Sequence, residues 1–180
     1  MSGLKNIKTL TMAGMLTALA IISGFFKIAI SDILEIRFST LPIAVAGAFF
    51  GPGVAAIVGA VSDIGGFLIR PTGPYFPGFT LSGALTGLIF GLCLHKKDGS
   101  SPGLFRVISG VLINTVLVKM LLDSLWLSML YGKGGVWAVL SVRFLKELVM
   151  IPVNIILIMA ITGPVFSVLN RSRSAPVVRS

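Results

Sequence analysis

The sequence is poor in charged residues, cysteine and histidine. Only 12% of its 180 residues are Asp, Glu, Lys or Arg, whereas a soluble domain carries about 25%. The single cysteine, Cys93, excludes an intrachain disulfide, and with one histidine, His95, it does not make a metal site. The shortage of charge, together with a hydrophobic share of 55%, indicates an integral membrane protein.

Long apolar runs account for most of the chain. A run of about 18 residues or more can cross the hydrocarbon layer as a helix, and the short alternating segments of a closed barrel are not found. The sequence therefore predicts an all-α integral membrane protein, with six transmembrane helices in one bundle. The expected spans are residues 7–30, 41–50, 54–69, 79–94, 104–130 and 136–169. They form a single domain, residues 1–170, followed by a flexible basic tail, residues 171–180.

The distribution of lysine and arginine predicts the orientation. With the N-terminus in the cytoplasm, the inner flanks hold Lys5, Lys8, Lys96, Lys97, Arg106, Arg171, Arg173 and Arg179. The outer flanks hold the smaller set Lys27, Arg37, Arg70 and Lys133. This excess predicts that both termini and the tail are cytoplasmic. The net charge of +9 follows from this bias, and no nucleic-acid partner is expected because that needs a basic surface on a soluble domain.

Several ionisable residues fall inside the expected spans, where they are costly and usually functional. They are Asp63, Lys119, Asp123, Arg143, Lys146 and Glu147. Helical spacing places Lys119, Asp123 and Trp126 on one face, and Arg143, Lys146 and Glu147 on another. In the predicted topology most of them lie in the outer half of the membrane, which indicates one polar cavity open to the outside. The alternative is that i,i+4 pairs such as Lys119 with Asp123 only join helices.

The loop "RPTGPYFPGFTLSG", residues 70–83, combines three prolines with aromatic residues. The prolines restrict its conformations and reduce the entropy lost when a ligand binds. Tyr75, Phe76, Phe79 and Trp126 offer ring faces to a flat ligand. Two alternatives remain open: the phenylalanines pack only within the loop, and Trp126 and Trp137 belong to an interfacial belt.

Small residues recur at four-residue spacing in two expected spans. Gly14-xxx-Ala18 lies in the first span and Ala56-xxx-Ala60 in the third, beside Ala13-xxx-Thr17 and Ala55-xxx-Gly59. Such faces let helices approach closely in lipid. They serve either packing within the bundle or docking onto another membrane protein.

One segment resembles a known family. Residues 37–91 contain Arg37-Phe38-Ser39, a Gly51-Pro52 turn, Asp63 within a span, and "FPGFTLS" from Phe76 to Ser82. In these features, in length and in number of spans, the chain resembles the folate-specific S components of energy-coupling factor (ECF) vitamin transporters. The chain departs from the family's Ala-xxx-Ala in the first span, where it has Gly14-xxx-Ala18.

The resemblance implies a high-affinity folate-binding subunit in a bacterial cell membrane. Such a subunit works with a scaffold transmembrane subunit and two ATPases, and has no ATPase site or catalytic residue of its own. The sequence agrees, because it has no phosphate-binding loop ending in Lys-Ser or Lys-Thr. Docking onto the scaffold would use the small-residue stripes, at Gly14, Ala18, Ala56 and Ala60.

The resemblance also implies a ligand, folate, with no further cofactor. A carboxylate, Asp63 or Asp123, suits the donor edge of the pterin ring. Basic groups suit the two tail carboxylates, with Arg37, Arg70, Arg143 and Lys146 as the candidates. The expected binding set is Arg37, Asp63, Tyr75, Phe76, Phe79, Lys119, Asp123, Trp126, Arg143, Lys146 and Glu147.

Three other functions stay open on the sequence alone. The nearest is an S component for another vitamin, namely niacin, pantothenate or riboflavin. A small membrane enzyme is the second, although the chain lacks a His-rich metal motif and a nucleophile–base pair. The third is a channel or secondary transporter that works alone.

Overall fold

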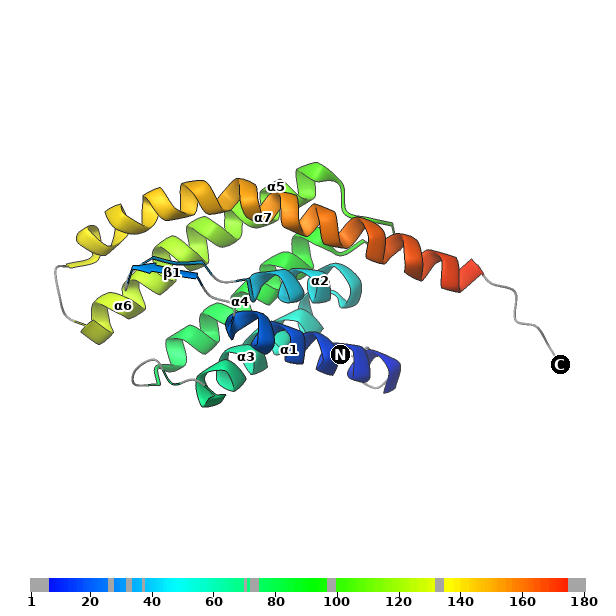
Figure 1. Ribbon diagram of the computed structural model, residues 1–180, viewed down its shortest axis with the longest axis horizontal. Helices are drawn as coiled ribbons and strands as arrows, with labels where there is room; N and C mark the ends of the chain where they lie inside the picture. The colour runs from blue at the N-terminus through cyan, green and yellow to red at the C-terminus, as the bar shows by residue number, and fades with distance from the viewer. Residues whose placement is uncertain are drawn as a thin grey trace.

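Six helical segments form one bundle in the computed structural model (Figure 1). It describes residues 7–25, 28–31, 34–36, 38–69, 71, 75–96, 100–131 and 135–174. The elements are α1 (Ile7–Phe25), β1 (Ile28–Ser31), β2 (Leu34–Ile36), α2 (Thr40–Phe50), α3 (Pro52–Ile69), α4 (Pro77–Leu94), α5 (Leu104–Ile113), η2 (Asn114–Leu122), α6 (Asp123–Tyr131) and α7 (Gly135–Ser174). Because α5, η2 and α6 follow one another without a break, the six predicted helical segments are confirmed.

The segment after α1 differs from the prediction. The first span was expected to continue to residue 30, but α1 ends at Phe25. Strands β1 and β2 then pair antiparallel, with Ile28 opposite Ile36 and Ala29 opposite Glu35. Isoleucine at alternate positions favours a strand over a helix, and the apolar run alone did not distinguish the two. β2 also contacts α7, so the hairpin packs against the bundle.

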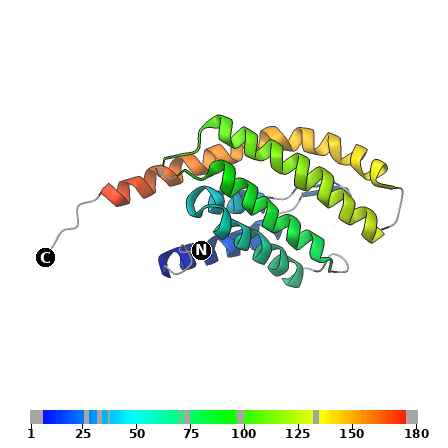
Figure 2. The ribbon, with the colours of Figure 1, turned by 180° about the vertical axis from the view of Figure 1, so that it is seen from behind.

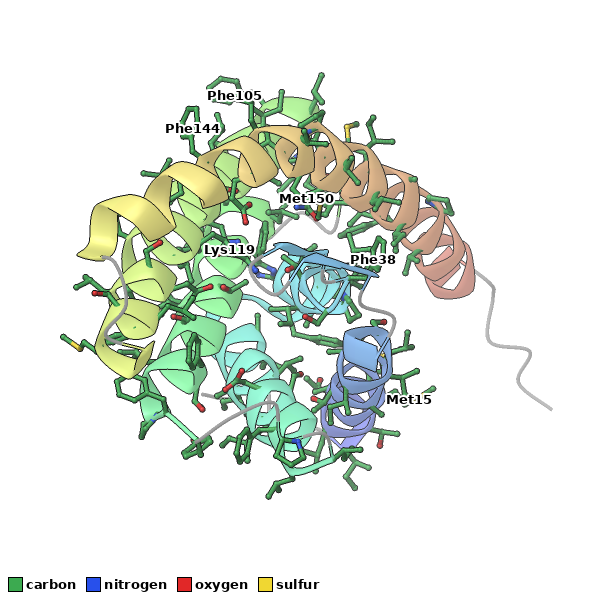
Figure 3. The ribbon with its side chains drawn as sticks, turned by 60° about the vertical axis from the view of Figure 1, so that its left-hand side comes forward. Met15, Phe38, Phe105, Lys119, Phe144 and Met150 are labelled. Carbon is green, nitrogen blue, oxygen red and sulfur yellow. The ribbon has the colours of Figure 1, made fainter. Side chains whose placement is uncertain are left out.

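Helix α2 is short and buried. Its 11 residues extend over about 16 Å, and positions 40–48 are all buried. It is apolar on every side, as a helix surrounded by other helices is, and Figure 3 shows it enclosed by the other helices. Gly51, with φ of 82°, ends α2 with a positive φ that glycine adopts without steric cost. Pro52 then opens α3.

A glycine seam joins α3 to α4. Gly83, Gly87 and Gly91 recur every four residues along α4, and their missing side chains bring it against Gly59, Ala55 and Pro52. A Cβ on Gly83 would come within 2.8 Å of the Gly59 carbonyl oxygen. Helix α4 contacts α3 more extensively than any other element does, because backbone meets backbone there.

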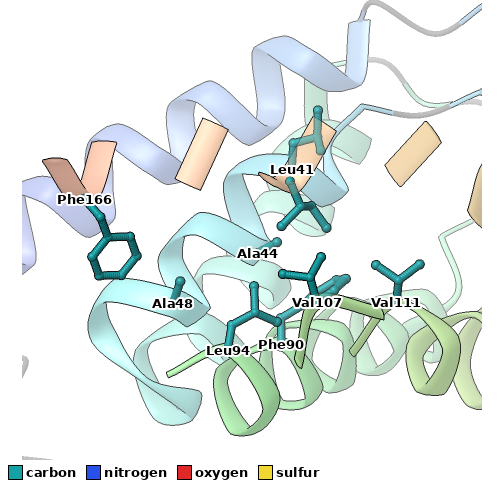
Figure 4. Close-up of a cluster of buried hydrophobic side chains, with 9 residues drawn as sticks. Leu41, Ala44, Ala48, Phe90, Leu94, Val107, Val111 and Phe166 are labelled. Atoms are coloured by element: carbon teal, nitrogen blue, oxygen red, sulfur yellow. The ribbon is translucent and has the colours of Figure 1, made fainter. Parts of the chain in front are cut away.

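The main hydrophobic core lies between α2, α4, α5 and α7 (Figure 4). Its buried members are Leu41, Ala44, Ala48, Phe90, Leu94, Val107, Val111, Ile158 and Phe166. The ring of His95, which follows α4, forms a hydrogen bond between its Nδ1 atom and the carbonyl oxygen of the core residue Ala48 at 3.2 Å. The last turns of α2 and α4 are therefore held together.

The helix formed by α5, η2 and α6 contains a π-helical stretch, Asn114–Leu122. Its exposed apolar side chains recur every four residues, at Ile113, Leu117, Leu121, Leu125 and Met129. In an α-helix a four-residue spacing drifts by about 40° per step. The wider π turns reduce this drift and keep the stripe on one side. The sequence predicted an ordinary helix here, so this stretch was missed.

Helix α7 is the longest element, with 40 residues and two internal prolines, Pro152 and Pro164. Internal proline removes a backbone hydrogen bond and bends a helix, and α7 arches over the bundle to a C-terminal part that projects beyond it (Figures 1 and 2). It continues to Ser174, so the first four residues of the expected tail are helical. Residues 175–180 lie outside the described residues.

The outer surface is strongly apolar. Among the described residues, four helical segments are long and apolar enough to cross a membrane: Pro52–Ile69, Pro77–Leu94, Leu104–Met129 and Glu147–Phe166. Met15, Phe105 and Phe144 point outward from three different helices (Figure 3). Such a surface is suited to hydrocarbon and not to water.

Candidate functional site

The rings of Phe76, Phe79 and Trp126 pack together at the N-terminal end of α4 and form an aromatic wall. Phe76 is the N-cap of α4 in an extended conformation, and Pro77 occupies the first turn, where proline is favoured. The Phe76 ring lies 5.4 Å from Trp126 of α6 and 6.2 Å from Phe79, measured between ring centroids. These are ordinary separations for interacting rings. Three of the predicted ring residues therefore come together.

Trp126 is fixed in the wall by two neighbours on α4. Its Nε1 donates a hydrogen bond to Ser82 Oγ at 3.2 Å. Gly78 leaves room for the rings, because a Cβ there would lie 2.6 Å from Trp126 Cδ2. A Trp126 side chain that is half-buried and hydrogen-bonded to a neighbouring helix differs from a ring that only lines the lipid interface.

A second set of side chains joins the loop to α3 and α4. Thr80 Oγ1 donates to Asp63 Oδ2 at 2.9 Å, and Tyr75 Oη lies 2.9 Å from Thr80 Oγ1. The Tyr75 ring also packs on Phe67 of α3, with 5.1 Å between centroids. Asp63 and Tyr75, predicted separately, are thus linked through Thr80.

The two sets lie on opposite sides of α4. Thr80 and Ser82 are two residues apart, which is about 200° around a helix. Thr80 faces Asp63 of α3, and Ser82 faces Trp126 of α6. Asp63 is therefore held in the α3–α4 seam, while the aromatic wall faces α6.

A polar stripe lies on η2 and α6, on the side away from the exposed apolar residues. Lys119, Asp123 and Trp126 are all half-buried, and Lys119 points toward the interior of the bundle (Figure 3). The sequence predicted this common face from α-helical spacing. A π-helix has more residues per turn than an α-helix. Residues four apart, such as Thr115, Lys119 and Asp123, therefore stay on one side of η2.

Asp123 carries a buried oxygen, Oδ1, that has no hydrogen-bond partner among the side chains that the structure describes. Asn114 Oδ1 and Ser124 Oγ share this property in the same part of the chain. Buried polar atoms are nearly always paired in folded proteins. An unpaired carboxylate oxygen three residues before Trp126 is an acceptor suited to a bound donor.

The remaining predicted residues are placed as follows. Glu147 of α7 is only 7% exposed, and α7 packs against both η2 and α6. Arg143 and Lys146 belong to α7, but the structure describes only their backbone and not their side chains. Arg37 lies outside the described residues. Their contribution stays a prediction.

The small-residue stripes divide into two kinds. Gly14 and Ala18 are exposed on α1, and a Cβ on Gly14 would meet nothing within 4 Å. Ala55 and Gly59 instead face α4 across the glycine seam. Ala56 and Ala60 are half-buried. The α1 stripe faces outward, whereas the Ala55 stripe serves internal packing. Docking through Gly14, Ala18, Ala56 and Ala60 stays a prediction.

Comparison with known proteins gives the family. The family described as "ECF transporter, substrate-specific component" matches residues 8–162. The chain belongs to this family of S components. It is therefore a multi-pass membrane subunit of a transporter and not an enzyme.

Individual relatives of this S component carry a common name. "Folate transporter FolT" of Clostridium novyi (strain NT) is 40% identical over 147 residues, which are 82% of this chain and 83% of that protein. "Folate transporter FolT" of Leuconostoc mesenteroides subsp. mesenteroides is 26% identical over 154 residues, 83% of this chain and 82% of the relative. A solved structure titled "Crystal structure of FolT bound with folic acid" superposes with a TM-score of 0.79 at 32% identity, covering 88% of this chain and 95% of that one.

Sequence reasoning missed the polar partners within this S component. Thr80 and Ser82 both lie in the "FPGFTLS" segment that carried the resemblance, but only its two rings were assigned a role. The available signal was a pair of hydroxyl residues two positions apart in an apolar span, which face opposite sides of a helix. Gly78 and Phe67 had no comparable signal, because their roles depend on which helices are neighbours.

Proposed function

We propose that this S component binds folate at the outer end of the bundle and hands it inward when docked on its transporter. The support is the combination of family membership, the FolT relatives and one structural observation. The observation that carries the proposal joins two features of α6: Trp126 packs on Phe76, and Asp123, one turn earlier on the same helix, has a buried Oδ1 atom without a hydrogen-bond partner among the described residues.

The chemistry of folate suits this pairing. Its pterin ring is flat and offers amino and ring N–H donors along one edge. The Phe76 and Trp126 rings can contact a flat heterocycle, and each such contact adds to apolar burial. The Asp123 carboxylate can accept the donor edge through a charge-assisted pair of hydrogen bonds.

The glutamate tail of folate needs positive charge. Lys119 points toward the interior of the bundle (Figure 3) and lies on the same stripe as Asp123. Arg37, Arg143 and Lys146 remain the further candidates, since an arginine can hold a carboxylate with two parallel hydrogen bonds. Glu147 is then suited to pairing with these cations and not to the ligand tail.

The proposed setting is a bacterial cell membrane with both termini in the cytoplasm. The named relatives come from bacteria, and the lysine and arginine distribution favours this orientation. It places the aromatic wall and the hairpin on the outer side, where folate arrives.

The proposed partners are a scaffold transmembrane subunit and two ATPases. The exposed Gly14–Ala18 stripe of α1 is suited to close helix contact with the scaffold. Gly14→Leu with Ala18→Leu should leave folate affinity unchanged and prevent copurification with the scaffold. Normal copurification of this double variant would remove α1 from the docking face.

The experiment that tests the function is a titration of the purified protein with folic acid, read by calorimetry. Tight binding with one folate per chain is expected, with niacin, pantothenate and riboflavin as controls. A well-folded sample that binds one of these vitamins and not folate would overturn the folate assignment.

A further inference from the structure

Two linked hydrogen bonds have a defined direction. A threonine hydroxyl has one proton, and Thr80 gives it to Asp63 Oδ2. Tyr75 must therefore donate its own proton to Thr80 Oγ1 across the 2.9 Å contact. Donors in such a series polarise one another, and the carboxylate at the end strengthens both bonds.

We propose that Thr80 is a positioning residue of the ligand site, which slows ligand release by holding the Tyr75–Phe76 segment onto α3 and α4. The inference rests on the proposed function. Thr80 does not lie on the aromatic wall, because it faces α3 while Ser82 faces Trp126. It acts through its neighbours in the chain.

The hydrogen-bond series from Tyr75 through Thr80 to Asp63 is directly adjacent in sequence to the aromatic wall. Tyr75 immediately precedes Phe76, whose ring lies 5.4 Å from Trp126. Tyr75 is 45% exposed, so burial alone does not hold it. Its phenol oxygen and its ring contact with Phe67 are the contacts that fix this segment on the α3 side.

Fixing Tyr75 restricts Phe76 from both sides. Phe76 is followed by Pro77, which fixes the backbone at the first turn of α4. With Tyr75 tethered before it, Phe76 has few ways to leave Trp126. Loss of the tether should therefore free the Phe76 ring to move and open the wall toward the outside.

The test measures folate release with Trp126 as the reporter. Trp137→Phe leaves Trp126 as the single tryptophan, and stopped-flow displacement of bound folate gives the release rate. Thr80→Val and Tyr75→Phe should each release folate about tenfold faster. The double variant should be no faster than either single variant, because both break one chain.

Two further variants separate positioning from general stability. Thr80→Ser keeps the hydroxyl group and should restore most of the slow release. Thr17→Val is the matched control, since among the described residues the Thr17 hydroxyl donates to the Ala13 carbonyl group of its own helix, one turn earlier, at 2.8 Å. A Thr80→Val release rate equal to that of Thr17→Val would overturn the inference.

Hydrogen exchange in the absence of ligand tests the tether independently of folate. Amide exchange in residues 75–79 should be faster in Thr80→Val than in Thr17→Val. Equal exchange in the two variants would overturn the tether whatever ligand the protein binds. Failure of the wild-type protein to bind folate, with faster exchange in Thr80→Val, would instead overturn the folate assignment alone.

Discussion

Gly78 lies against the indole ring of Trp126, so closely that a Cβ at residue 78 would be 2.6 Å from Trp126 Cδ2. The same Cβ would also press on the Phe76 ring. A glycine in the first turn of α4 thus permits the aromatic wall. Its role is steric, because the described backbone has positive φ only at Gly51.

The first prediction follows from this contact. Gly78→Ala should displace Phe76 or Trp126 and weaken folate binding about tenfold, since overpacking costs about 1–3 kcal/mol. Calorimetry measures the dissociation constant. Gly163→Ala is the matched control, because a Cβ there meets nothing within 4 Å. Equal affinities for both variants would contradict a steric role for Gly78.

The second prediction concerns Asp123. Asp123→Asn keeps the size of the side chain and replaces an ionised acceptor by an amide. A hydrogen bond to a charged group contributes about 1.5–3 kcal/mol, so folate affinity should fall about 10- to 100-fold. The melting temperature should change little. Unchanged affinity would remove Asp123 from the site.

The third prediction concerns the bond between Trp126 and Ser82. Ser82→Ala removes the acceptor at 3.2 Å, and a single such bond contributes about 1 kcal/mol. Folate affinity should fall about fivefold, and Trp126 emission should shift in the Trp137→Phe background. Emission that is identical with and without the Ser82 hydroxyl would show that the bond does not form in solution.

The fourth prediction tests the glycine seam. Gly87→Ala would drive a methyl group into the Ala55 carbonyl group, and the helices would have to separate. Stability in detergent should fall by about 1–3 kcal/mol or more, measured by thermal unfolding. Gly14→Ala, on the exposed α1 stripe, should leave the melting temperature unchanged.

The fifth prediction tests the orientation. In a Cys93→Ser background, the Pro71→Cys variant should react with an impermeant maleimide in intact cells. The Ser101→Cys variant should react only after the cells are permeabilised. Both residues are exposed in the structure. The reverse pattern would place the termini outside.

Much of the fold could be predicted because hydrophobic periodicity and turn residues are local properties. Helices α3 and α4 begin at Pro52 and Pro77, two residues before the predicted starts at residues 54 and 79, because proline suits the first turn of a helix. The hairpin was missed, since a short apolar run with isoleucines fits either a helix end or a strand. The π-helical stretch was missed because its hydrogen-bond register leaves no residue-type signal.

The candidate site was predicted in part for the same reason. Costly charges and clustered rings stand out in an apolar sequence, which identified Asp63, Asp123 and Trp126 as residues of interest. Which of these residues lie together depends on the side of α4 that each one contacts. Sequence alone placed Asp63 and Asp123 near one cavity, whereas the structure shows Asp63 bonded to Thr80 in the α3–α4 seam.

The glycine seam has a mechanical consequence. At Gly83, Gly87 and Gly91 the backbones of α3 and α4 touch directly, so no side chain lies there to absorb a displacement. Helices α3 and α4 should therefore move as one rigid unit. The α4–α6 boundary is different, because Trp126, Ser82 and Phe76 meet there through side chains that can change rotamer. Opening of the bundle for a flat ligand should therefore occur at the side-chain contacts between Phe76, Ser82 and Trp126 and leave α3 and α4 together.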